Sequence, residues 1–111
     1  MSKPKLTIRF FRSAQGREPV RDWLKGLNDQ ARKAIGDDIR TVQFGWPLGM
    51  PLVEKLEKDL WEVRVDLPDG IARVLFTIHE DEAILLHGFV KKSRKIPKDD
   101  LETARRRRRL I

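Results

Sequence analysis

The fold is decided by one stretch, LWEVRVDLPDGIARVLFTIHEDEAILLHGFVK, residues 60–91. Its first eight residues alternate, with Trp61, Val63 and Val65 on one side of an extended chain and Glu62 and Arg64 on the other. PDG at 68–70 is a strong turn signal, and the acidic EDE at 80–82 separates two mostly apolar runs. The stretch therefore predicts three consecutive strands in an antiparallel meander.

The residues before this stretch predict a further strand and two helices. KLTIRFF at 5–11 suits a strand, and Pro19 is tolerated at the first position of a helix. After GLND at 26–29, Asn28 or Asp29 can cap a second helix. Apolar residues recur at helical spacing in both helices: Val20, Trp23, Leu24 and Leu27, then Ala31, Ile35, Ile39 and Val42. The two helices are expected to form a hairpin whose apolar side covers the sheet.

A last helix is expected after KIP at 95–97, with acidic residues first and Arg105–Arg109 last, the charge order that the helix dipole favours. FGWPLGMP at 44–51 is interpreted as a loop that packs Trp46 and Met50 on the core. The expected fold is α+β. It consists of a small twisted antiparallel sheet, in the order β-α-α-β-β-β-α, packed against an N-terminal helical hairpin, with a C-terminal helix and one domain over residues 1–111.

Composition limits the classes of function. The chain of 111 residues has no cysteine, which excludes disulfides and thiolate metal sites and fits a reducing cytoplasm. Charged residues interrupt the apolar N-terminus, and no segment has the length of a membrane span, so a protein that is neither exported nor embedded in a membrane is expected. Its histidines, His79 and His87, are too few for a zinc site, and no metal or other cofactor is expected.

The net charge of +7 is concentrated in the last quarter of the chain. Residues 1–83 contain 14 Lys or Arg and 14 Asp or Glu, whereas residues 84–111 contain 10 and 3. Within this quarter, Lys91, Lys92, Arg94 and Lys95 fall inside five positions. A balanced chain with one basic segment suggests a polyanionic partner, and the alternative is a solvated helix with a basic end.

Three segments carry a resemblance to a known family: PVRDWLKGL at 19–27, FGWPLGMPLVEKLEKDLWEVRVDLPDGIARVLF at 44–76 and LHGFVKKSRKIPKDDLETA at 86–104. Over nearly its full length the chain resembles the RelE/ParE toxin superfamily of type II toxin-antitoxin systems, and within it the HigB-like, phage-related branch. The resemblance implies a small twisted sheet backed by a helical hairpin. It also implies an endoribonuclease that cleaves messenger RNA in the ribosomal A site.

The chemistry of the residues is compatible with that activity. In a meander, Arg64, Arg73 and the pair Lys91 and Lys92 can converge, and such cations repel one another unless an anion lies between them. A scissile phosphate is such an anion, and arginine can hold it with two hydrogen bonds. RNA supplies its own nucleophile, the 2′-hydroxyl, so no metal is required. The alternative for Arg73 is a pair with a nearby acid such as Glu62.

His87 is a candidate general acid or, alternatively, a hydrogen-bonded core residue. Relatives in the superfamily place a tyrosine in the C-terminal segment, but this chain contains no tyrosine, so that role passes to Phe89, to His87 or to no residue. The expected residues are Arg64, Arg73, Lys91, Lys92 and His87 for catalysis, and Phe89, Arg94, Lys95, Arg105 and Arg106 for RNA binding.

Two other functions stay open at this point: a non-catalytic basic module that binds ribosomal RNA or DNA, and a gyrase inhibitor of the ParE type. The resemblance also implies partners. These are the ribosome with its messenger RNA and a HigA-like helix-turn-helix antitoxin, through which the complex would bind operator DNA.

Overall fold

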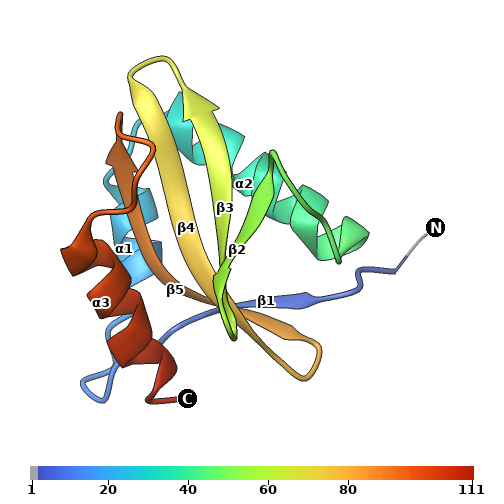
Figure 1. The fold of residues 1–111 in the computed structure, drawn as a ribbon. Coiled ribbons are helices and arrows are strands. Elements are labelled where there is room, and N and C mark those ends of the chain that lie inside the picture. The colour runs from blue at the N-terminus through green and yellow to red at the C-terminus, as the bar shows by residue number, and fades with distance from the viewer. Residues whose placement is uncertain (1–2) are drawn as a thin grey trace.

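The computed structural model describes residues 3–111 and contains one five-stranded sheet with the strand order β1-β5-β4-β3-β2. Figure 1 shows α1 and α2 on one face of this sheet and α3 on the other. The α+β architecture expected from the sequence is therefore confirmed. The strands are β1 (Thr7–Phe10), β2 (Val53–Glu57), β3 (Leu60–Leu67), β4 (Gly70–His79) and β5 (Glu82–Lys91), and the helices are α1 (Pro19–Lys25), α2 (Asp29–Gly45) and α3 (Lys98–Arg108).

The expected meander is confirmed, because β3 pairs antiparallel with β4 and β4 pairs antiparallel with β5. The turn between β3 and β4 depends on Gly70, whose φ of 155° lies in a region that other residues rarely adopt. A side chain there would also meet the carbonyl of Lys91 at 3.4 Å. The turn and the end of β5 therefore pack closely together.

Two features of the sheet differ from the expectation. The strand β2 is an addition to the expected elements, and it pairs antiparallel with β3 so that Val53 lies opposite Val63. The first strand, β1, pairs parallel with β5, so the sheet is mixed and not purely antiparallel. A parallel pair requires a long crossover between distant segments. Here the chain forms α1 and α2 after β1, and then begins β2 at the other edge of the sheet.

The helical hairpin covers the face of β3 that carries Val63 and Val65. Pro19 is the first residue of α1, and the side chain of Asn28 caps α2 by accepting a hydrogen bond from the Ala31 amide at 2.8 Å. The four predicted core residues of α2 are all buried: Ala31, Ile35, Ile39 and Val42.

The loop before β2 agrees with the sequence interpretation at one aromatic residue and differs at the methionine. Trp46 packs edge-on against Trp61, with ring centroids 5.5 Å apart, and against Phe76 at 5.7 Å. Met50 is 66% exposed, so its expected place in the core is wrong. Met50 lies in the turn that leads into β2, and its side chain does not pack in the core.

A second, smaller core lies on the other face, where α3 covers β5 and part of β4. Leu101 and Ala104 of α3 pack there against buried residues such as Leu75, Leu86 and Phe89. Among residues 3–111, the helices are too short or too polar to cross a membrane.

Candidate functional site

Several of the predicted site residues share the face of the sheet that carries α3. Arg64 of β3 lies directly opposite Arg73 of β4, and Arg73 lies opposite Phe89 of β5. Residues paired across strands point to the same face, and so do residues two apart in one strand. Lys91, two residues after Phe89, therefore belongs to this face as well. The strand register therefore brings Arg64, Arg73 and Lys91 to one face of the sheet, as the meander predicted.

Arg73 is enclosed in this neighbourhood and is only 1% exposed. Its Nη2 donates a hydrogen bond to the main-chain oxygen of Ser93 at 2.5 Å, and its Nη1 lies 3.6 Å from Oε2 of Glu62. The pairing with Glu62 is the arrangement that the sequence offers as an alternative to phosphate binding. The structure thus leaves no surface of Arg73 free for a ligand.

Glu62 connects the two arginines of the site. Its Oε1 lies 3.6 Å from Nε of Arg64, while its Oε2 faces Arg73. Burial raises the pKa of Glu62, because the charged form loses hydration, and the two arginines act in the opposite direction. Glu62 is 1% exposed, so it belongs to the interior of the site.

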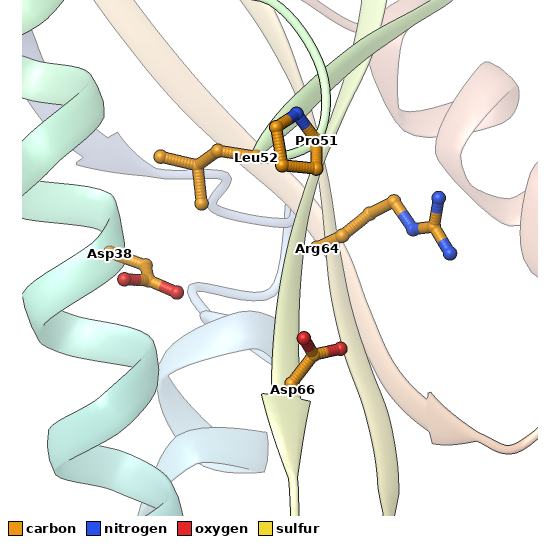
Figure 2. Close-up of a pocket in the computed structure, with 5 residues that line it drawn as sticks. All are labelled: Asp38, Pro51, Leu52, Arg64 and Asp66. Atoms are coloured by element: carbon orange, nitrogen blue, oxygen red, sulfur yellow. The ribbon is translucent and has the colours of Figure 1, made fainter.

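Arg64 reaches the surface, with 24% of its side chain exposed. It lines an open hollow of about 400 Å³ at the edge of β3, together with Asp38, Pro51, Leu52 and Asp66. Figure 2 shows the guanidinium extending from β3 away from Asp38. Burial, followed by the neighbouring carboxylates of Asp37 and Asp66, raises the pKa of Asp38. The hollow therefore combines one cation with two nearby acids.

The segment Lys91–Lys95, called the cationic segment below, begins at the last residue of β5. Its four cations are exposed, and among residues 3–111 none of them lies within 4.0 Å of an acid. Ser93 lies at its centre. Its carbonyl accepts the bond from Arg73, and its hydroxyl accepts a bond from the Lys95 amide at 3.2 Å. The segment is anchored by its main chain, and its charges are left for solvent or a ligand.

His87 and Phe89 are engaged with α3. The Nε2 atom of His87 lies 2.6 Å from Oδ1 of Asp100, and its Nδ1 lies 3.4 Å from a guanidinium nitrogen of Arg107. Arginine can only donate, so Nδ1 accepts in this arrangement and Nε2 donates. Phe89 is 6% exposed and belongs to the smaller core. Both residues join β5 to α3 here: Phe89 is buried, and both ring nitrogens of His87 already have partners while its side chain remains 19% exposed.

The arginine run at the end of α3, Arg105–Arg109, divides into paired and exposed residues. Arg105 donates from Nε and Nη2 to Glu57 of β2, at 3.0 Å and 2.7 Å, and Arg108 donates to the carbonyl of Lys58 at 2.8 Å. Arg107 donates to the carbonyl of Leu86 at 2.8 Å. The paired arginines fasten α3 to the sheet, and the two exposed residues of the run are Arg106 and Arg109.

Sequence reasoning misses two residues that organise the site. Ser93 acts through its main-chain carbonyl, for which a residue type gives no signal. The sequence marks Asp100 only as a dipole-favoured acid in the first turn of α3, although its carboxylate also bonds His87. Among residues 3–111, no three acidic or histidine side chains are grouped closely enough to hold a metal ion.

The fold and this face define a class: a small basic protein with a helical hairpin behind a mixed sheet and an exposed cationic segment beside α3. Residues 22–109 match the model of the phage-derived protein Gp49-like family (DUF891), and the chain belongs to that family. This family is a RelE/HigB-like family of toxins from toxin-antitoxin systems. No curated protein matches the chain.

Proposed function

We propose that the chain is the toxin of a type II toxin-antitoxin system and acts as a ribosome-dependent endoribonuclease on translated messenger RNA. The observation that carries this proposal is the cationic segment, whose four cations are exposed on a chain whose other cations are largely balanced by acids. Arg64 adds a partly exposed guanidinium on the α3 face of the same sheet. Such a surface suits the phosphate backbone of RNA.

The reaction proposed for this surface is attack of the 2′-hydroxyl oxygen on the adjacent phosphorus. The 2′-hydroxyl gives up its proton as a bond forms between its oxygen and phosphorus. The bond from phosphorus to the 5′ oxygen breaks, the departing oxygen takes up a proton, and a 2′,3′-cyclic phosphate is left. Negative charge grows on the phosphate oxygens during this step. Arg64, Lys91 and Lys92 are proposed to stabilise that charge, Arg94 and Lys95 to hold the flanking backbone, and no metal is needed.

Membership of a toxin family implies an antitoxin partner. We propose a HigA-like helix-turn-helix protein for this partner, with operator DNA bound through the complex, and a cytoplasmic location where translating ribosomes occur. An acidic surface on the antitoxin would be attracted to the cationic segment and could cover it. The ribosome and the antitoxin are then alternative ligands of one cationic surface.

Primer extension on cellular messenger RNA after brief induction tests this function. Discrete breaks within translated codons are expected for the natural chain, and Lys91→Ala/Lys92→Ala should remove them. Loss of even one transition-state donor costs on the order of 3 kcal/mol, or roughly a hundredfold in rate. The control is Lys25→Ala/Lys58→Ala, which removes one exposed cation from α1 and one from the turn between β2 and β3.

Three outcomes contradict the proposal. DNA damage without breaks in messenger RNA would indicate a gyrase inhibitor. Ribosome binding without breaks or damage would indicate a non-catalytic RNA-binding module. Equal loss of cleavage in the control variant would show that Lys91 and Lys92 have no special place in the reaction.

A further inference from the structure

The buried ion pair of Glu62 and Arg73 is the most unusual feature of the interior. Each of these residues is 1% exposed, and the atoms Glu62 Oε2 and Arg73 Nη1 are 3.6 Å apart, slightly beyond hydrogen-bond distance. Among residues 3–111, Glu62 Oε2 and Arg73 Nε have no hydrogen-bond partner. The pair is therefore buried but incompletely satisfied.

Stability alone gives a poor account of such a pair. Two charges lose their hydration on burial, and only good geometry with additional hydrogen bonds compensates for that loss. Apolar residues of similar volume often serve a protein interior equally well or better. The surroundings would suit them, since Leu75 on β4 and Phe89 on β5 are both buried beside Arg73. A buried ion pair with incomplete hydrogen bonding therefore suggests a role other than stabilising the fold.

That role is indicated by the one short hydrogen bond that Arg73 makes. Its Nη2 donates at 2.5 Å to the carbonyl of Ser93, in the middle of the cationic segment and 20 residues away in the chain. The exposed cations of that segment repel one another, and no acid among residues 3–111 pairs with them. A charged donor from the interior is a means of holding this main chain in one place.

Glu62 contacts Arg64 as well as Arg73. Its two carboxylate oxygens face different arginines, Oε1 toward Arg64 and Oε2 toward Arg73. One buried carboxylate therefore lies between the partly exposed arginine of β3 and the arginine that anchors the segment after β5. Glu62 therefore lies within 3.6 Å of both cationic parts of the site.

We propose that Glu62 and Arg73 are positioning residues: Glu62 orients both arginines, and Arg73 holds the cationic segment through the Ser93 carbonyl so that Lys91 and Lys92 meet the RNA phosphate together with Arg64. This inference rests on the proposed function for its consequence in catalysis. Its structural part, the anchoring of the segment by Arg73, stands independently of that function. Arg73 itself does not touch the substrate in this account.

The decisive variant is Glu62→Met/Arg73→Met, which removes both charges and leaves no buried ion unpaired. It is expected to unfold in urea at least as late as the natural chain. Trypsin, which cuts after lysine and arginine, should nevertheless cut within the cationic segment about fivefold faster, as expected when one anchoring hydrogen bond is removed. Mass spectrometry of the fragments identifies the cut. RNA cleavage at saturating ribosome should fall roughly a hundredfold, the effect of a small misplacement of reacting groups.

Two further variants serve as comparisons. Glu62→Gln keeps the shape of the side chain and removes its charge, so the segment should be cut at a rate between those of the natural chain and the double variant. Ile35→Val loosens α2 in the core on the other face and should alter neither segment cutting nor RNA cleavage.

Each possible result has a distinct meaning. A stable double variant that cleaves RNA normally would overturn the proposal, and so would a segment that resists trypsin as well in the double variant as in the natural chain. If the segment stayed resistant while RNA cleavage disappeared, Arg73 would act on the substrate directly. If the natural chain cut no RNA at all, the proposed function would fail, and the trypsin rates alone would still decide whether Arg73 holds the segment.

Discussion

The cationic segment and the arginine run of α3 have nearly the same density of positive charge and opposite surroundings. In the cationic segment, the four cations of Lys91–Lys95 are exposed, and the main chain is the part held by the protein. In the arginine run, Arg105 and Arg108 bind Glu57, and Arg107 binds the carbonyl of Leu86. A run of cations in a sequence is therefore available to a ligand only where the fold brings no acid or carbonyl against it.

The acid that chiefly distinguishes the two segments, Glu57, comes from a distant part of the chain. Glu57 lies 48 residues before Arg105, on the strand β2. The contact with Arg105 also lowers the pKa of Glu57, chiefly through the hydrogen bonds that favour its charged form. Glu102, within α3 itself, adds a second contact to Arg105 at 2.5 Å. The end of α3 is thus attached to the opposite edge of the sheet by charge-assisted bonds.

The largest effect is expected from Glu57→Lys, which would convert the arginine run into unpaired cations. Arg105 and Arg108 would then face a like charge across a partly buried contact. Because the contact is partly solvated, we expect a loss of roughly 1–2 kcal/mol in the free energy of unfolding, measured by urea denaturation. The control is Asp81→Lys, the same charge change in the exposed turn between β4 and β5. Equal unfolding curves for the two variants would show that Glu57 does not attach α3.

A smaller effect is expected from pH. Because the pKa of Glu57 is lowered by folding, its contribution to stability is complete above the ordinary value of 4.5 and is lost as pH falls through the lowered value. The variant Glu57→Gln should therefore be less stable than the natural chain near neutral pH, and the difference should shrink in acid. The comparison also cancels the opposite contribution of Glu62, whose raised pKa favours the folded state as pH falls. A difference that stayed constant from neutral pH into acid would contradict the ion pair.

The smallest effect is expected from Arg106→Gln/Arg109→Gln. These two arginines are the exposed members of the arginine run, and among residues 3–111 neither makes an ion pair. The free energy of unfolding, measured by thermal denaturation, should change by less than about 0.5 kcal/mol, as for most surface substitutions. A larger loss would mean that the whole run, and not only its paired members, holds α3 in place.

Much of the fold could be predicted because its signals are local. The alternation around Val63 identifies β3, Asn28 caps α2, and Gly70 marks the turn before β4. The strand β2 escapes prediction because VEKLE mixes charged and apolar residues over five positions, and it becomes a strand only through pairing with β3. The parallel pairing of β1 with β5 depends on how the chain crosses the helical layer, which no local pattern encodes.

Only the part of the site that depends on strand alternation and strand pairing could be predicted from the sequence. The alternating pattern correctly places Arg64 and Glu62 on one face, and the meander brings Arg73 beside them. Burial of Arg73 could not be predicted, because the segment that covers it follows the end of β5 and is held by a main-chain carbonyl. The sequence offers a hydrogen-bonded role for His87 as an alternative but does not identify its partner, because Asp100 meets it only after α3 has packed on the sheet. The pairing of Arg105 with Glu57 is hidden for the same reason.

The sharpest test compares ribosome binding by two variants of equal charge, Lys91→Gln/Lys92→Gln and Arg106→Gln/Arg109→Gln, over a range of salt concentrations. Each variant removes two exposed cations from a chain of net charge +7. If the cationic segment binds RNA, only the first variant should bind more weakly. The slope of its log affinity against log salt should also be shallower, by about 0.7–0.9 for each phosphate that the variant no longer neutralises. Equal weakening of both variants, or a greater loss in the second, would contradict the division of the two segments into a binding surface and a structural attachment.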